Sequence, residues 1–388
     1  MAVRPFRPEH EALRQAVADF VAREVTPFVE AWEQAGATPR ALLRRMGEQG
    51  FLGVKYPAEL GGAADLLGDF VVQEETARCG AAGVAAVIGA HTSIATPHLW
   101  RLGTPEQQRR WLAPAVAGDA LWALAVTEPD AGSDVAGIGT VARREGETYV
   151  VEGAKTFITN GVDADYIVVA VRTGPPGAHG LSLLVLPGDT PGLSRRRVPT
   201  LGWRTSQTGE LHFDACRVPV ANRLGAENQG FGYIMQGFEW ERLVMAGTAV
   251  VQAELAIADA IAYTQQRQAF GRPVASFQVV RHRLAALNAE LFAARRLTYD
   301  ALAEYAAGAG DPAARASLSA LCAQAKLVST ELACRATDAN VQLHGGHGYM
   351  MEYRAQRLWR DARLGTIGGG TSQIMREVIA RRLGLPPS

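Results

Sequence analysis

Two polar loops lie close together in a β-rich stretch near the middle of the chain. They are residues 127–134 (TEPDAGSD) and 155–161 (KTFITNG). Runs of β-branched and aromatic residues surround them at 149–151, 166–169 and 181–186, whereas the regions before and after have the apolar periodicity of helices. A small β-rich region with two hydroxyl-bearing loops inside a helical chain predicts a platform for a polar cofactor.

The hydroxyl groups of these loops allow two interpretations. Thr127, Ser133 and Thr159, with the backbone amides around them, are suited to the ring edges and pyrophosphate of a flavin. Alternatively, these loops only cap strands through Asx- and Ser/Thr-turns. The residues by themselves favour neither interpretation.

Residues 137–142 (GIGTVA) match the letters of a dinucleotide-binding fingerprint. A true fingerprint follows a strand and opens a helix. Here a polar loop precedes the motif and a strand-like hairpin follows it, so we reject this interpretation.

Composition excludes several classes of protein. The 388 residues include 39 basic and 39 acidic side chains, a balance that gives no basic field for nucleic acid. No apolar stretch looks long enough to span a bilayer, and the N-terminus lacks the apolar core of a signal peptide. The cysteines show no CxxC spacing, which argues against a disulfide framework or a zinc site. We expect a soluble cytoplasmic protein that binds neither nucleic acid nor membrane.

The chain divides into three predicted domains: helical residues 1–121, a β domain at 122–228 and a helical domain at 229–388. The fold class is therefore α+β and mostly helical. In the first domain, Thr26-Pro27 should interrupt a helix. In the last domain, one helix at 230–265 precedes two long Ala/Leu-rich helices at 276–306 and 312–343, which is typical of a four-helix bundle.

An acidic residue interrupts an apolar stripe on the helix at 230–265. Ile234, Phe238, Glu241 and Met245 follow one another at steps of four, three and four, so they share one face. A buried acid is costly unless it is paired or performs chemistry, and desolvation would raise its pKa and make it a better base. The alternative is a buried acid paired with an arginine elsewhere. Glu239 lies on another face, three residues before Arg242, as an ion-pair partner would.

Glycine clusters follow the long helices, at 345–348 and 368–370. Glycine lets a ligand approach the backbone, and the amides at the helix start after Gly370 suit an anion or a developing oxyanion. His344 and His347 lack a third ligand at any familiar spacing, so we predict no metal site.

Five motifs together resemble the acyl-CoA dehydrogenase family over essentially the whole chain. TEPDAGSD, KTFITNG, RQAFGRP with the following FQ, QLHGGHGYMMEY and GGGTSQI occur in the family's order and near its spacing. The last-but-one segment and WERLVMAG look most similar to the long-chain and isovaleryl branches. The resemblance implies a helical N-terminal domain, a central antiparallel β domain and a C-terminal four-helix bundle. It also implies FAD between the last two and a homotetramer or dimer.

The resemblance also implies site residues. Those expected to bind FAD are Leu124, Val126, Thr127, Gly132, Ser133, Phe157, Ile158, Thr159, Arg267, Phe270, Gln278, Gln342, Leu343, Gly345, Gly346, Thr371 and Gln373. Of these, Arg267, Gln278 and residues 342–346 would reach FAD held mainly by a neighbouring subunit. Those expected to contact substrate are Ser133, Glu239, Arg242, Gly369 and Gly370.

The catalytic base is where this chain departs from the commonest family pattern. Many members carry a glutamate directly before the glycine of an EGT motif, and Gly369 stands there in this chain. The long-chain and isovaleryl branches place their base on the bundle helix, where the matching residue is Glu241. Two independent arguments therefore indicate Glu241 as the base.

The implied reaction is α,β-dehydrogenation of an acyl-CoA thioester to the trans-2-enoyl-CoA. Glu241 would remove the pro-R α-proton, a hydride would pass to flavin N5, and electrons would continue to an electron-transfer flavoprotein. One alternative is an acyl-CoA oxidase or a flavin-dependent monooxygenase. The other is a non-catalytic scaffold that binds flavin or acyl thioester, which the presence of Glu241 disfavours. The length and branching of the acyl chain stay open.

Overall fold

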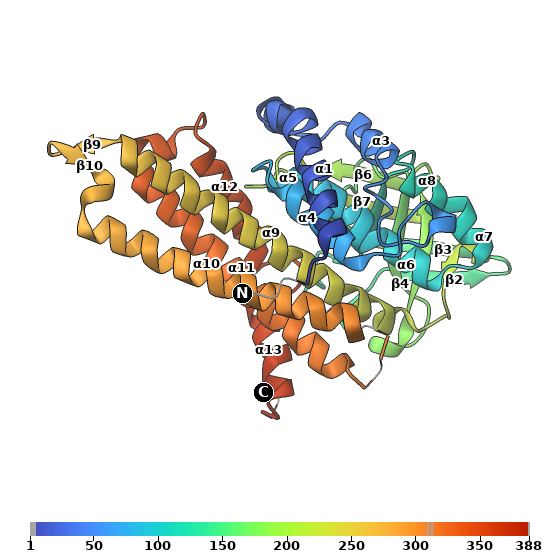
Figure 1. The fold of residues 1–388 in the computed structure, drawn as a ribbon. Coiled ribbons are helices and arrows are strands. Elements are labelled where there is room, and N and C mark those ends of the chain that lie inside the picture. Colours follow the sequence, from blue (N-terminus) through green and yellow to red (C-terminus); the bar gives the residue numbers. More distant parts are fainter. Residues whose placement is uncertain (1–4, 309, 312, 387–388) are drawn as a thin grey trace.

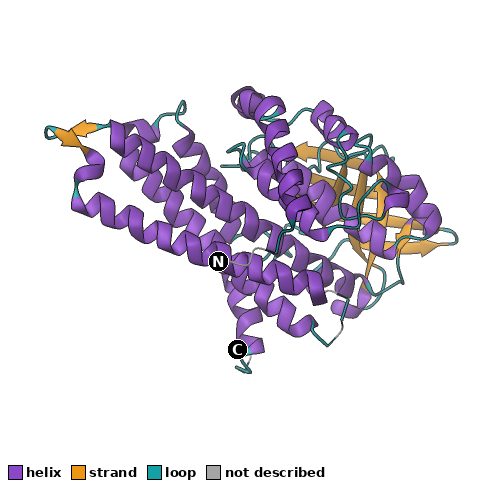
Figure 2. Cartoon of the chain, in the orientation of Figure 1, coloured by secondary structure: helices purple, strands orange, loops and turns teal. Residues whose placement is uncertain are grey.

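A computed structural model describes residues 5–308, 310–311 and 313–386 and shows three successive regions (Figure 1). A helical N-terminal domain comes first, a β-sheet domain follows, and a helical C-terminal domain ends the chain. Figure 2 shows the strands gathered at one end of the molecule, except for a small hairpin at the opposite end. The fold class is the predicted one, whereas the domain limits at 121 and 228 stay predictions.

The N-terminal domain is built from short helices. The predicted interruption at Thr26-Pro27 is confirmed, because a 3-10 turn, η1 (Thr26–Phe28), separates the first two helices. One π-helical segment, η4 (Gln108–Leu112), joins α7 to α8, and another, η3 (Ala90–Ala95), joins α5 to α6. The helices are α1 (Pro8–Glu24), α2 (Val29–Ala35), α3 (Arg40–Glu48), α4 (Leu66–Ala77), α5 (Ala82–Gly89), α6 (Thr96–Leu102), α7 (Pro105–Gln107) and α8 (Ala113–Val116).

The central sheet has the strand order β6-β7-β3-β2-β4-β5-β8, with β1 beside β4. Most pairs are antiparallel as predicted, but β1 pairs with β4 in parallel, and β2 meets β4 in parallel at one position. The reason is that β3 reverses the direction of β2 and β4 reverses that of β3. The strands are β1 (Trp122–Ala125), β2 (Val141–Glu145), β3 (Thr148–Ile158), β4 (Tyr166–Arg172), β5 (Leu181–Pro187), β6 (Leu193–Arg197), β7 (Gly209–Pro219) and β8 (Arg223–Leu224).

The rejected dinucleotide fingerprint lies between the loop at 127–134 and strand β2. A 3-10 turn, η5 (Val135–Gly137), precedes β2, and no helix opens behind the motif in this described segment. The segment at 137–142 thus lacks the helix that a dinucleotide fingerprint would open.

Three long helices form the C-terminal domain. They are α9 (Gly230–Gln266), α10 (Gln278–Gly308) and α11 (Arg315–His344), within a few residues of the predicted limits. Pro312, the predicted start of the third helix, lies outside the described residues. Two shorter helices, α12 (Arg354–Ala362) and α13 (Ser372–Arg382), also pack against α11.

Helix α9 is the central element of this domain (Figure 1). By length and composition it could cross a membrane, so the prediction that no stretch was apolar enough for this is wrong. Within the protein, 56% of its most apolar window is buried. Packing inside the domain thus accounts for an apolarity that the sequence alone leaves open.

Helix α9 also crosses α4 closely. A Cβ atom added at Gly247 would lie 2.4 Å from Cζ of Phe70. The Phe70 ring is 1% exposed and is held by Phe6, Trp240 and Tyr299, so it has little room to move. The absence of a side chain at this position therefore sets how closely the N-terminal domain meets the bundle.

We predict that Gly247→Ala lowers the free energy of unfolding by about 1–3 kcal/mol, because the methyl group overpacks the α4–α9 contact. Gly232→Ala is the matched control, since a Cβ at Gly232 in the same helix meets nothing within 4 Å. It should be neutral or stabilise by about 0.5 kcal/mol through helix propensity. Urea unfolding of both variants measures the difference, and equal effects would contradict this account of Gly247.

A buried ion pair joins the two polar loops of the β domain. Lys155 Nζ donates to Glu128 Oε1 at 2.8 Å and to the Val126 carbonyl at 2.9 Å. The Glu128 carboxylate also accepts two backbone N–H groups, that of Gly139 at Oε2 (2.6 Å) and that of Thr140 at Oε1 (2.9 Å). Lys155 holds the pKa of Glu128 below its usual range, despite the burial that raises it. The pair therefore fixes the loop at 127–134 relative to strand β3.

Because removing one member of a buried pair strands the other charge, we predict that Lys155→Met costs about 3 kcal/mol of unfolding free energy. The control is Arg143→Met. Arg143 pairs with Glu152 in the same sheet, but the two side chains are 65% and 44% exposed, so the loss should stay below about 1 kcal/mol. Chemical denaturation compares the two variants. A similar loss in both would show that the Lys155 pair does not organise the loops.

Candidate active site

Helix α9 places Ile234, Phe238, Glu241 and Met245 along one face, as the periodicity predicted. The Glu241 carboxylate forms neither a hydrogen bond nor an ion pair with any residue in the described part of the chain. The alternative of an acid paired with a distant arginine is therefore not met. Glu241 keeps part of its surface exposed. Desolvation of its carboxyl group is nevertheless the largest influence and raises its pKa to about 7, while Arg242 and Lys326 act in the opposite direction. A carboxylate of this kind is half ionised near neutral pH and is a stronger base than an ordinary glutamate.

The glycine turn at 368–370 lies directly against this carboxylate. Gly369 and Gly370 have φ angles of +61° and +96°, which side-chain-bearing residues adopt only with strain. A Cβ at Gly369 would lie 3.4 Å from Glu241 Oε1 and 2.5 Å from Met245 Sδ. Met245 therefore fills the space that a side chain on the loop would need, and the carboxylate that lies near Gly369 is that of Glu241, from the helix.

Two cations hold the carbonyl groups of the glycine turn. Lys326 Nζ donates to the Gly370 carbonyl at 2.6 Å, and Arg242 Nε donates to the Gly369 carbonyl at 3.4 Å. The predicted pair between Glu239 and Arg242 is wrong: within the described residues the two side chains form no ion pair. Arg242 instead lies over the Phe238 ring, 5.9 Å from its centroid, and faces the loop. Glu239 stays largely buried, and its pKa is raised by burial.

The loop hydroxyls of the β domain are free to bind a ligand. The side chains of Thr127, Ser133 and Thr159 make no hydrogen bond with the residues described, so capping of the strands by these hydroxyls is not observed. Phe157, two residues before Thr159, has a φ of +59° and 64% of its surface exposed. Free hydroxyls beside an exposed aromatic ring fit a ligand with a flat ring and polar edges, such as a flavin. Of the other residues predicted here, Gly132 is exposed, Leu124 is partly buried, and Val126 and Ile158 are buried.

A second group of predicted residues lies at the far end of the bundle, around the hairpin β9 (Gln268–Ala269) and β10 (Arg272–Pro273) (Figure 1). There Tyr263 stacks on His344 with ring centroids 4.1 Å apart, which joins the ends of α9 and α11. Along α9, Arg267 is about 39 Å from Glu241 at a rise of about 1.5 Å per residue. One chain thus does not bring this group to its own Glu241. The group comprises Arg267, Phe270, Gln278, Gln342, Leu343, Gly345 and Gly346.

Thr371 and Gln373 line a cleft of about 490 Å³ between α11 and α13. The Thr371 hydroxyl caps α13 by accepting the Ile374 N–H at 3.2 Å. Arg335, Arg363 and Arg376 also line this cleft, which favours an anionic ligand.

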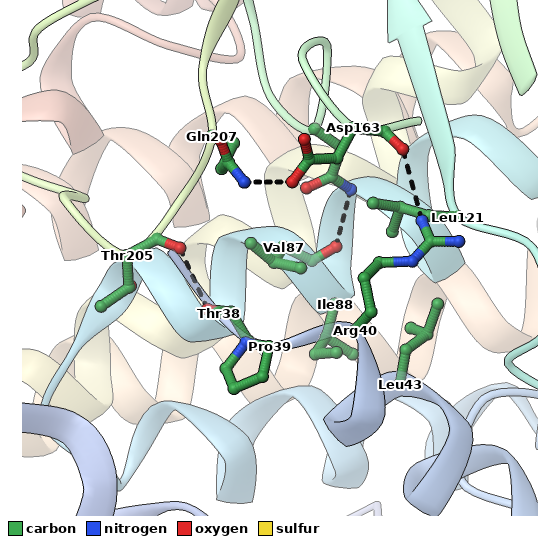
Figure 3. A pocket seen from close by; sticks show the side chains of 11 residues that line it. Thr38, Pro39, Arg40, Leu43, Val87, Ile88, Leu121, Asp163, Thr205 and Gln207 are labelled. Atoms are coloured by element: carbon green, nitrogen blue, oxygen red, sulfur yellow. Dashed lines mark hydrogen bonds between the residues drawn. The ribbon is translucent and has the colours of Figure 1, made fainter. Parts of the chain in front are cut away.

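A second, much smaller pocket lies between the N-terminal domain and loops of the β domain (Figure 3). Asn160 and Gln207 donate into its wall, to the Val87 carbonyl at 3.0 Å and to Asp163 respectively. Its volume of about 20 Å³ is room for about one water molecule. It is too small for a substrate or cofactor. Over the described residues, no group of three or more His, Cys, Asp or Glu side chains could hold a metal ion.

Lys326 and the Lys155–Glu128 pair were not predicted from the sequence, and neither was the position of Met245 against the glycine turn. A signal existed for Lys326, a lone cation in the Ala/Leu-rich segment around residue 326, and it is the signal that identified Glu241. The contacts between Met245 and Gly369 and between Lys155 and Glu128 join residues far apart in the chain, and no sequence pattern indicated them.

Comparison with known proteins identifies the family. The N-terminal, middle and C-terminal domain models of acyl-CoA dehydrogenases match residues 7–119, 123–216 and 228–384. The chain is 36% identical to the mitochondrial long-chain specific acyl-CoA dehydrogenase of Rattus norvegicus, over 98% of this chain and 87% of that protein.

Solved structures indicate the same family. A probable acyl-CoA dehydrogenase from Mycobacterium abscessus has a TM-score of 0.93 and 42% identity, covering 98% of this chain and all (100%) of that one. A glutaryl-CoA dehydrogenase from Mycobacterium smegmatis, in complex with FADH2, has a TM-score of 0.90 and 27% identity, covering 98% and 95%. With its three domains in the same order, this chain belongs to the acyl-CoA dehydrogenase family and is an acyl-CoA dehydrogenase, a flavoprotein oxidoreductase.

Proposed function

We propose that the protein catalyses the FAD-dependent α,β-dehydrogenation of an acyl-CoA thioester to the trans-2-enoyl-CoA, with Glu241 as the base. The observation that supports this most is the state of the Glu241 carboxylate. It has no partner among the described residues, its pKa is raised to about 7 by burial, and it lies against the Gly369 turn. A carboxylate held this way can take up a proton from a bound substrate.

The α-carbon next to a thioester is a weak acid, so the site must stabilise the enolate charge as the proton leaves. The Gly369 N–H has no acceptor in the described part of the chain and is available to the thioester oxygen. Arg242 and Lys326 hold the carbonyl groups of the same turn, which keeps this amide in place. The apolar side chains Phe238 and Met245 on either side of Glu241 help to exclude water.

FAD, when bound, supplies the acceptor for the hydride that leaves the β-carbon. The residues that would hold it are the free hydroxyls of Thr127, Ser133 and Thr159, with Thr371 and Gln373 on α13. Ser133, Glu239, Arg242, Gly369 and Gly370 would contact the substrate. The electrons would then pass to an electron-transfer flavoprotein, as the family resemblance implies.

The residues at the bundle tip would complete the cofactor site of a neighbouring subunit. Their distance from Glu241 in the same chain supports this, and so do large exposed apolar side chains there. Phe270 is 95%, Val279 76% and Tyr349 87% exposed. A second copy of the chain would cover them. We propose a homotetramer, with a dimer as the alternative.

Replacement of the base tests the mechanism. We predict that Glu241→Gln keeps its flavin but loses about 10³-fold in the rate of flavin reduction, because the amide preserves shape and cannot accept the proton. Anaerobic stopped-flow bleaching with a panel of straight, branched and aromatic acyl-CoAs measures this rate. The control is Glu254→Gln, on the same helix, where Glu254 pairs with Arg78 and Arg295.

Near wild-type bleaching by the Glu241→Gln variant would refute the assignment of the base. Oxygen uptake separates the remaining alternatives: an oxidase consumes oxygen in step with product, whereas a dehydrogenase requires an added electron acceptor. Absence of flavin from the purified protein would exclude both.

The pH dependence gives an independent prediction. The ionised form of Glu241 is the active one, so kcat/KM should be constant above its pKa of about 7 and fall as the pH decreases. Well below that value the fall approaches about tenfold per pH unit. A profile of kcat/KM from pH 5.5 to 9 checks it. An acidic limb near the ordinary glutamate pKa would mean that the carboxylate is not desolvated in the working enzyme.

A further inference from the structure

We propose that Lys326 is a positioning residue of the active site: its buried ammonium group holds the Gly370 carbonyl and supplies the positive charge that keeps the Glu241 carboxylate ionised. The inference rests on the proposed function, in which Glu241 is the base. Nothing in the sequence motifs assigns a role to this lysine.

The geometry places Lys326 and Glu241 on two sides of the same pair of glycines. Lys326 extends from α11, is 0% exposed, and its Nζ donates to the Gly370 carbonyl at 2.6 Å. Glu241 extends from α9, and its Oε1 is 3.4 Å from where a Cβ of Gly369 would lie. A fully buried ammonium group is costly unless it performs a task. Here it joins α11 to the turn on which the proposed base depends.

The charges around Glu241 are few. Arg242 on α9 and Lys326 on α11 face it, both lower its pKa, and the glycines at 368–370 contribute no ionisable side chain. Lys326 lies beyond ion-pair distance of Glu241 within the described residues, so it acts through space and leaves the carboxylate free for the substrate proton.

The groups that face Lys326 are Glu241 and Arg242 on α9, and Glu331 and Cys334 on its own helix. Glu331 is already paired with Arg376 at 2.6 Å, and the Cys334 thiol donates to the Ala362 carbonyl at 3.4 Å. Burial lowers the pKa of Lys326 to about 8, which leaves it protonated at neutral pH. Its charge therefore acts mainly on the proposed base.

Three substitutions separate the charge from the hydrogen bond. Lys326→Gln removes the charge and keeps an amide donor, Lys326→Met removes both, and Lys326→Arg keeps the charge. In water-excluded surroundings a nearby charge shifts a carboxyl pKa by about one unit or more. We expect the acidic limb of the flavin-reduction rate to move up by about one pH unit in the Gln and Met variants. That shift means about a fivefold loss at pH 7 that is recovered at pH 9. In Lys326→Arg the limb should stay at the wild-type pH.

Flavin content and thermal unfolding establish that each variant is folded. If Lys326→Met does not fold, the comparison of Lys326→Gln with Lys326→Arg still tests the effect of the charge. Arg143→Gln is the control for loss of one positive charge, since it removes an exposed arginine of the sheet and should leave the profile unchanged. If the acidic limb of the flavin-reduction rate in Lys326→Gln stays at the wild-type pH, the proposal is overturned. This holds even if the rate falls by the same factor at every pH.

This outcome is distinguishable from failure of the proposed function. If acyl-CoA bleaches the wild type and Glu241→Gln abolishes bleaching while the Lys326 variants keep the wild-type limb, only the role of Lys326 fails. If Glu241→Gln bleaches normally, the base assignment fails first.

Discussion

Removal of water from one carboxylate is the constraint on which this active site depends. A glutamate in water is too weak a base to attack the carbon beside a thioester, and a glutamate paired with a cation is weaker still. Glu241 avoids both states: the protein buries it enough to raise its pKa to about 7, yet no described residue binds it. An unpaired acid in such a place destabilises the fold. Its presence is better explained by chemistry than by packing.

The surrounding fold fixes the positions of the two parts of the site, helix α9 with Glu241 and the hydroxyl-bearing loops of the β domain. Helix α9 carries Glu241 and packs against α10 and α11, and the close crossing with α4 at Gly247 fixes that helix against the N-terminal domain. On the other side, the Lys155–Glu128 pair locks the two hydroxyl-bearing loops to the sheet. Each side is rigid by itself, so a cofactor between them would meet a preformed surface.

Sequence periodicity predicted the parts of this structure that depend on local pattern. The long helices and the shared face of Ile234, Phe238, Glu241 and Met245 followed from spacing, because residues three and four apart lie on the same side of a helix. Contacts between distant segments were not predictable in this way. The parallel pairing of β1 with β4, the turn of Arg242 away from Glu239, and the position of Lys326 beside Gly370 all depend on how separate elements dock. The apolar composition of α9 did not distinguish a buried bundle helix from a membrane-spanning one, because both environments favour the same apolar residues.

Met245 and Gly369 explain why the acid is on the helix and not on the loop. Both positions lead to the same space, and Met245 Sδ already lies 2.5 Å from where a loop Cβ would be. A glutamate on the loop would displace that methionine and would have to adopt a left-handed backbone conformation at a φ of +61°. Because Gly369 has no side chain, the turn can approach α9 closely. The Gly369 amide and the Glu241 carboxylate would then both reach one bound substrate. In this chain the proposed base on the helix and the side-chain-free turn form a single arrangement, because Met245 and the backbone conformation of Gly369 leave no room for an acid on the turn.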